Sequence, residues 1–178
     1  IMFHHFHSEK HPQYQGSLSQ EDFKRIIDYI GVERFLSPLE WLEKLAEKNL
    51  SYKDLCLTFD DGLLSQIEVA LPVLEHFRLK AFWFVYSSVF EGEWSNLEIY
   101  RFFRTKYFDN IDDFYGLFFR KIFELGLLEQ INPGVEEKAI IELRRFFPFY
   151  SVNDARFRFI RDRVLGRLSY EKIMDSIL

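Results

Sequence analysis

Apolar positions in the first half of the chain come in short runs separated by polar turns and helix-like segments. One run, residues 55–59, ends in Asp60-Asp61-Gly62, which is typical of a buried strand that delivers its acids to the carboxyl edge of a sheet. Residues 2–6 and 81–86 have the same strand-like character, and residues 35–36 are expected to form a short second strand. Strands that alternate with helices predict βαβ units and a parallel sheet or barrel.

Helix-start signals stand between these apolar runs. Ser19 and Ser37 each precede an acid by three positions, which is the spacing of a helix cap, and apolar residues then recur at helical spacing. The first of these helices should end at Gly31. Residues 63–77 are also helical in pattern, with Pro72 breaking or restarting the helix.

The pattern changes after residue 94, because no strand-like run returns and aromatic residues recur at helical spacing. Helices are expected from Ser95 onward, over residues 114–122, 136–147, 151–164 and 170–178. We therefore divide the chain into an α/β segment, residues 1–94, and a phenylalanine-rich, all-helical insertion or subdomain, residues 95–178.

Composition and charge narrow the class of protein. A chain of 178 residues that is 48% hydrophobic can bury one sizeable core, or one core and an appended subdomain. The net charge is −5, of which residues 1–94 hold −6 and residues 95–178 hold +1. Neither part is basic enough for a nucleic-acid partner. The Arg/Phe stretches 101–104 and 156–159 are interpreted as helices with an aromatic core and arginine flanks.

Cysteine content and hydropathy bear on location. The single cysteine, Cys56, cannot form an internal disulfide and is expected to be a small buried residue of its strand. No secretory signal and no transmembrane segment of apolar residues is recognisable, which favours a cytoplasmic location. The chain starts inside an expected strand, and we expect its natural N-terminus to be missing.

Three segments resemble one protein family. The motif Thr58-Phe59-Asp60-Asp61-Gly62 resembles the first motif of the polysaccharide deacetylases, the NodB-like metal-dependent carbohydrate esterases. Met2-Phe3-His4-His5 is similar to the opening strand of many members, and residues 80–85 are similar to their next strand. The resemblance covers about residues 1–90. It implies the N-terminal part of a distorted (β/α) barrel, followed here by the helical insertion.

The resemblance also implies an activity and residue roles. Such a hydrolase removes acetyl groups from N-acetylated sugars of a polysaccharide or lipopolysaccharide precursor, with Zn²⁺ as the expected metal. A divalent metal lowers the pKa of a bound water, and a nearby carboxylate takes its proton. Carried over to this chain, the family pattern makes Asp60 the general base and Asp61 a metal ligand. Gly62 allows a tight turn close to the substrate.

Further residues are expected to line the pocket at the same edge of the sheet. His4 and His5 end the first strand there, and Phe59 precedes the two acids. For either histidine the alternative is a strand-end side chain bonded to backbone.

The chain departs from the family pattern in its histidines. The family completes its metal site with a later His-Ser/Thr-x-x-His motif, but the only histidine after the acids is His76, expected at the surface. Either the chain is a fragment that stops before that motif, so that the full site needs residues beyond Leu178, or His7 and His11 of His7-Ser8-Glu9-Lys10-His11-Pro12 supply the ligands. The second explanation requires a helical turn, for which this stretch has no signal.

Two rival classes remain open. Haloacid-dehalogenase-like phosphatases place Phe-Asp at a strand end, but they need acids two positions apart, whereas Asp60 and Asp61 are adjacent. A non-catalytic interaction module carried on a degenerate esterase domain is the other alternative. An apolar groove on the helical half would favour that module.

Overall fold

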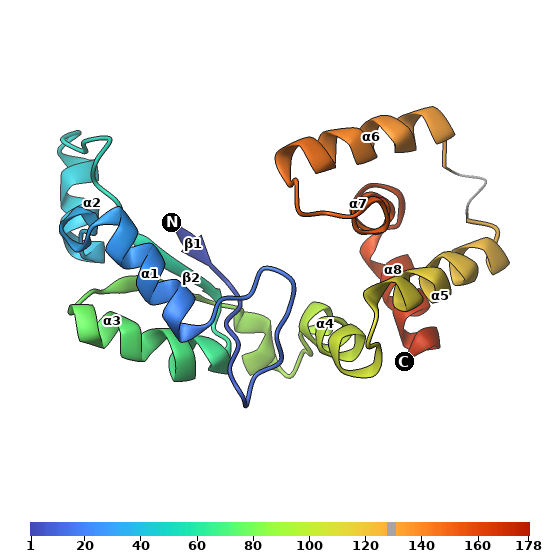
Figure 1. Cartoon of the computed structure of the whole chain (residues 1–178), viewed down its shortest axis with the longest axis horizontal. Helices are drawn as coiled ribbons and strands as arrows, with labels where there is room; N and C mark the ends of the chain where they lie inside the picture. The colour runs from blue at the N-terminus through green and yellow to red at the C-terminus, as the bar shows by residue number, and fades with distance from the viewer. Residues whose placement is uncertain (128–130) are drawn as a thin grey trace. The chain divides into compact units, whose positions relative to one another are not determined.

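Contacts along the chain divide it into a first unit, Ile1–Ser95, and a second unit, Asn96–Leu178 (Figure 1). The computed structural model describes residues 1–127 and 131–178. Each unit has its own cluster of buried side chains. The two units are therefore described separately.

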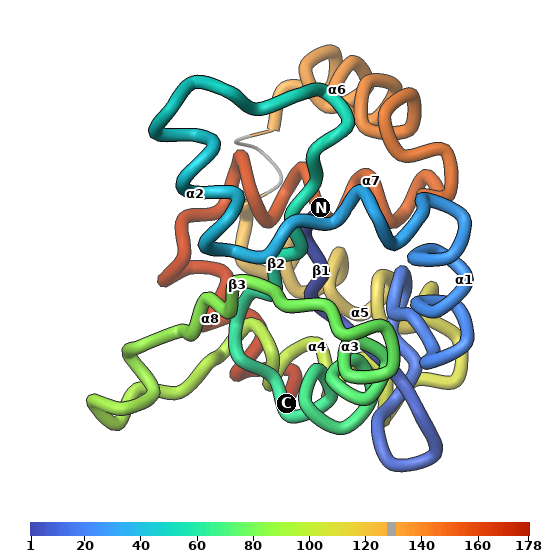
Figure 2. Tube along the Cα trace, turned by 90° about the vertical axis from the view of Figure 1, so that its left-hand side faces the viewer, coloured from blue at the N-terminus to red at the C-terminus, as the bar shows by residue number. Residues whose placement is uncertain are grey.

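The first unit is built on a parallel sheet of three strands in the order β1-β2-β3 (Figure 2). β1 is Met2–Phe3, β2 is Leu57–Asp61 and β3 is Ala81–Val85. Phe3 pairs with Phe59, and Phe59 pairs with Trp83, so β2 lies in the centre. The predicted α/β class is confirmed. The sheet is open, however, because among the described residues β1 and β3 each pair with β2 alone, and no barrel is formed.

Two helices of the first unit begin where the capping signals place them. α1 (Gln20–Ile30) follows Ser19, and α2 (Pro38–Ala46) follows Ser37. Each serine oxygen accepts a hydrogen bond from the backbone N–H three residues on, and the acid there accepts one from the serine N–H. Both capping boxes are therefore confirmed, because their partners are local in sequence.

Pro72 restarts a helix. A π-helical turn, η2 (Gln66–Ala70), leads into α3 (Leu71–Phe77), and Pro72 is the second residue of α3. In the first turn of a helix the missing N–H of proline costs no intrahelical hydrogen bond. The N–H of Leu71, just before the proline, donates to the backbone oxygen of Gln66 in the π-helical turn.

The predicted strand at residues 35–36 is wrong. Phe35 forms only an isolated parallel bridge with Leu55. The 3-10 helix η1 (Val32–Arg34) ends just before Phe35, and Ser37 already caps α2. No length of chain is left for a strand.

One face of the sheet carries the core of the first unit. Helices α1 and α3 lie side by side (Figures 1 and 2), and their apolar residues pack with Leu57 and Phe59 of β2. Because successive strand residues point to opposite faces, Ala81 and Trp83 of β3 share this side. The rings of Phe59 and Trp83 stack at 4.5 Å between centroids.

The opposite face of the sheet holds the alternate residues. Thr58 and Asp60 of β2 lie there with Phe82 and Phe84 of β3. Met2 pairs with Thr58 and is 60% exposed, and Phe84 is 55% exposed. This face is left largely uncovered within the first unit.

All regular elements described in the second unit are helical. They are α4 (Asn96–Tyr107), α5 (Ile111–Glu124), α6 (Pro133–Phe146), α7 (Val152–Phe159), the π-helical η5 (Ile160–Val164) and α8 (Arg167–Ile177). α6 starts three residues earlier than expected, because Asn132 caps it through its side-chain oxygen. α8 also starts three residues early, at Arg167 after Gly166.

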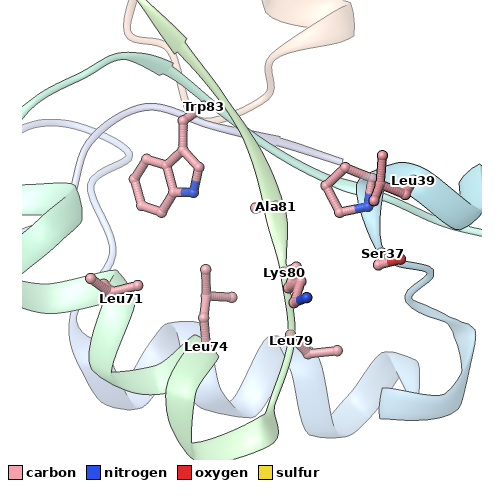
Figure 3. A pocket seen from close by; sticks show the side chains of 9 residues that line it. Ser37, Leu39, Leu71, Leu74, Leu79, Lys80, Ala81 and Trp83 are labelled. Carbon is pink, nitrogen blue, oxygen red and sulfur yellow. The ribbon is translucent and has the colours of Figure 1, made fainter. Parts of the chain in front are cut away.

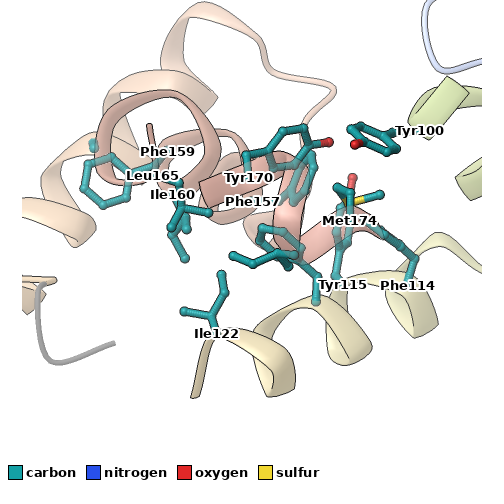
Figure 4. Close-up of a cluster of buried hydrophobic side chains, with 13 residues drawn as sticks. Tyr100, Phe114, Tyr115, Ile122, Phe157, Phe159, Ile160, Leu165, Tyr170 and Met174 are labelled. Carbon is teal, nitrogen blue, oxygen red and sulfur yellow. The ribbon is translucent and has the colours of Figure 1, made fainter. Parts of the chain in front are cut away.

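The core of the second unit is aromatic (Figure 4). Phe114, Phe118 and Phe157 are almost completely buried and contact one another edge to face or tilted. The guanidinium of Arg104 lies over the rings of Phe114 and Phe157, at 5.4 and 4.9 Å from their centroids. The interpretation of the Arg/Phe stretches as core helices agrees with these contacts. Burial lowers the pKa of Arg104 from its ordinary value.

Cys56 is buried and free, as its position before the acids predicts. Burial raises the pKa of its thiol, which keeps the sulfur protonated and inert. In the part of the chain that the structure describes, no helix has the length and apolar character to span a bilayer.

Candidate active site at the carboxyl edge of the sheet

The two acids stand at the carboxyl end of the central strand. Asp60 belongs to the uncovered face, and its Oδ2 lies 3.6 Å from Nε2 of His4. His4 follows β1 directly, and Phe84 is the β3 partner of Asp60. His4, Asp60 and Phe84 therefore form one row across the three strands. The side chains of His4 and Asp60 are 37% and 28% exposed, so both are accessible to a small molecule.

Asp61 and Gly62 make the turn that ends β2. Their φ angles are +75° and +64°, in the left-handed region that few residues other than glycine adopt. A Cβ on Gly62 would stand 3.2 Å from Cγ1 of Val85. This turn leaves the exposed Asp61 carboxylate at the edge of the sheet. A non-glycine residue in this conformation is the kind of local strain found at functional sites.

Gln66 links the backbones of the two residues that approach at the site. Its side chain is fully buried and hydrogen bonded to the backbone of both His4 and Asp60. Sequence reasoning missed this residue, because its partners include one 62 positions away. The one usable signal is a long amide side chain four residues after an Asp-Asp-Gly turn.

His5 and Phe59 were both predicted to line the pocket. His5 stays near the edge, with its ring stacked on that of His4 at 6.0 Å, and its backbone oxygen accepts a hydrogen bond from Leu18. Phe59 instead lies in the helix-covered core and is completely buried. The cause is the alternation of strand side chains, which places Phe59 and Asp60 on opposite faces.

His7 and His11 lie in the loop after β1 and are bound to different partners. Nδ1 of His7 is 2.9 Å from Oγ of Ser17, and Nε2 of His11 is 2.9 Å from Oε2 of Glu68. Between them, Ser8 and His11 exchange two backbone hydrogen bonds in a tight turn. This stretch is not helical. The geometry that a shared metal would need from two histidines four residues apart is therefore absent from this loop. His76 is exposed, as predicted.

The donor set does not fit a complete zinc site. Catalytic zinc sites use three protein ligands and an open position. Within residues 1–127 and 131–178, no three His, Cys, Asp or Glu side chains come together in a metal-binding group. Asp61 is therefore at most one ligand of such a site. The described residues offer a carboxylate beside an imidazole, which can accept and hold a proton.

Two pockets of the first unit lie away from the acids. One, of about 320 Å³, opens at the amino end of β3 and has a mostly apolar lining with Lys80 and Ser37 but no acid or histidine (Figure 3). The other, of about 750 Å³, lies between the loop holding His7, the start of α1 and η2. Neither is lined by Asp60 or Asp61.

Comparison of the chain with protein-family models, with curated proteins and with solved structures found no match.

Proposed function

We propose that the chain is the N-terminal part of a NodB-like polysaccharide deacetylase that removes acetyl groups from N-acetylated sugars of a polysaccharide or lipopolysaccharide precursor. The observation that carries the proposal is the approach of His4 and Asp60 at the carboxyl ends of two neighbouring strands. Active sites of parallel α/β folds lie at this edge. The left-handed Asp61-Gly62 turn directly beside it supports the resemblance of the Thr58–Gly62 motif.

We propose a distorted barrel as the complete fold, and the uncovered face of the sheet supports this. Parallel sheets are normally covered on both faces, yet here the face with Thr58, Asp60 and Phe84 is left largely uncovered in the first unit. In a barrel this face would be the inner one, and the row of His4, Asp60 and Phe84 would stand at its mouth. Strands that pair with β1 and β3 would close the sheet.

In this proposal Asp60 is the general base. A water attacks the acetamide carbonyl carbon while the Asp60 carboxylate takes its proton. That proton then passes to the amide nitrogen as the C–N bond breaks, so that acetate and the sugar amine are released and Asp60 is again a carboxylate. Nε2 of His4 lies 3.6 Å from Oδ2 of Asp60, on one side of the carboxylate. Asp61 would bind a divalent metal, Zn²⁺ by resemblance. The described residues do not complete that site, so we assign no step to the metal.

Asparagine variants of the complete protein test these roles. Asp60→Asn should lower the rate of acetate release from an N-acetylated glycan by about 10² to 10⁴-fold, the loss typical of a general base, with metal content unchanged. Asp61→Asn should lose metal affinity first, and excess Zn²⁺ should partly restore its rate.

Asp28→Asn, an exposed position on α1, is the matched control for loss of one charge. Equal, metal-rescuable losses in both variants would show that the two roles are wrongly assigned, and undiminished activity in both would contradict the deacetylase proposal.

A non-catalytic interaction module is the second candidate. Phe146, Phe147 and Phe149 are 62%, 41% and 65% exposed at the connection between α6 and α7, and contiguous exposed aromatic residues often mark a binding surface. A complete protein that releases no acetate, and whose binding to a partner protein is lost in a Phe146→Ser, Phe149→Ser double variant, would establish this candidate instead.

A further inference from the structure

A single buried amide joins the ends of β1 and β2. Gln66, the first residue of η2, has no exposed surface. Its Nε2 donates to the backbone oxygen of His4 at 2.8 Å and to that of Asp60 at 2.5 Å. Its Oε1 accepts from the backbone N–H of Leu63 at 3.2 Å. One side chain thus contacts both strand ends and the turn that follows β2.

The amide group matches this environment completely. A glutamine side chain has two N–H donors and one carbonyl acceptor, and here each N–H meets a different backbone oxygen. A buried polar group without partners is costly, so a residue that leaves these carbonyls unpaired is disfavoured. Leucine at this position would remove all three of these hydrogen bonds. Glutamate would place carboxylate oxygens against two carbonyl oxygens, and asparagine is one methylene too short to reach both strands.

The two backbone oxygens belong to the residues whose side chains meet at the site. His4 and Asp60 approach to 3.6 Å between Nε2 and Oδ2, and Gln66 donates to the backbone oxygens of these two residues. Because Gln66 binds both backbones, it fixes the distance between the backbones of His4 and Asp60. That distance in turn determines how closely their side chains can approach. The third bond, to Leu63, fixes the turn that carries Asp61 and Gly62.

We propose that Gln66 is a positioning residue of the deacetylation site, which sets the placement of Asp60 relative to His4 and of the turn with Asp61. This inference rests on the proposed function. Misplacement of a catalytic group by about 1 Å can cost on the order of 10²-fold in rate. Loss of Gln66 should therefore act on the chemical step more than on substrate binding.

The test compares Gln66→Leu and Gln66→Asn with Tyr115→Phe in the complete protein. Tyr115 donates a buried hydrogen bond to Asp154 in the second unit, so its phenylalanine variant loses a buried bond far along the chain from the site residues. For folded Gln66→Leu we expect kcat to fall by about 10- to 100-fold with KM within about threefold of the wild type. Tyr115→Phe should keep kcat within about twofold. If Gln66→Leu does not fold, the same comparison is made with Gln66→Asn.

Amide hydrogen exchange supplies a readout independent of activity. In the Gln66 variants, exchange over residues 60–64 should rise by at least about tenfold, while the amides of α5 stay as in the wild type. A folded Gln66 variant with kcat within twofold of the wild type, or with unchanged exchange over residues 60–64, overturns the inference. A wild-type protein without deacetylase activity overturns the proposed function instead, and exchange alone then decides whether Gln66 orders the strand ends.

Discussion

Gly62 shows how strictly one position at the edge of the sheet is constrained. Its φ of +64° disfavours any residue with a Cβ, and the space that a Cβ would take is limited by Val85. The neighbouring Asp61 accepts a φ of +75°, which Asp tolerates better than most residues. The backbone strain of this turn is therefore concentrated beside the candidate site.

Gly62→Ala should lower the free energy of unfolding of the first unit by about 1–2 kcal/mol, through the positive φ and the contact with Val85. Urea unfolding followed by tryptophan fluorescence measures this. A double variant with Val85→Ala should recover only the steric part of the loss. Gly116→Ala, within α5 and with open space around its Cβ position, is the control. It should leave the fluorescence transition unchanged and stabilise the second unit by about 0.5–1 kcal/mol, as measured by far-UV circular dichroism. A Gly62→Ala protein as stable as the wild type would contradict this explanation.

Helix α1 illustrates stabilisation at the level of one element. Hydrogen bonds from the Ser19 hydroxyl and backbone N–H, and then Arg25, lower the pKa of Asp22 from 3.8 to about 2. A carboxyl whose folded-state pKa is depressed contributes stability above its unfolded pKa, and that contribution is lost as the pH falls toward the folded value. The capping box should therefore weaken between about pH 4 and pH 2.

Asp22→Asn removes this carboxyl and should flatten the corresponding part of the pH dependence. The urea midpoint of the first unit, measured from pH 6 to pH 2, should fall less steeply below pH 4 in Asp22→Asn than in the wild type. Ser19→Ala should have a similar effect, because the carboxylate loses its hydroxyl partner. Parallel curves for the wild type and Asp22→Asn would show that the box does not set this dependence.

Elements whose determinants are local were predictable from the sequence, and those set by distant contacts were not. The caps at Ser19 and Ser37 depend on residues three positions away, and both helices start where expected. Asp60 and Asp61 at the end of an apolar run were found in the same way. By contrast, the role of Gln66 depends on the approach of β1 to β2. The burial of Phe59 depends on which face of the sheet the helices cover. Residues 35–36 have strand composition, but adjacent helix signals leave them no room.

At the scale of the whole chain, the two units have separate cores and separate optical probes. All three tryptophans, at positions 41, 83 and 94, belong to the first unit. Tryptophan fluorescence therefore reports unfolding of the first unit alone. Far-UV circular dichroism is dominated by helices, which make up all the regular structure described in the second unit.

The two probes should give unfolding transitions that do not coincide, because the two units have separate cores. Phe118→Ala removes a fully buried ring from the second core and should cost about 3–5 kcal/mol there. The circular dichroism transition should move to lower denaturant while the fluorescence midpoint stays in place. A fluorescence midpoint that moves by the same amount would mean that the chain unfolds as one cooperative body.

The free edge of β3 has a consequence for the chain during and after synthesis. Among the described residues β3 pairs only with β2, so its outer backbone groups can pair with another extended segment, and the exposed Phe84 and Val85 add apolar surface there. Residues 1–94 carry a net charge of −6, which makes copies of this unit repel one another. Because salt screens that repulsion, self-association of nascent or isolated chains through β3 should increase with ionic strength. The negative charge of the first unit therefore opposes edge-to-edge pairing between copies of the open sheet.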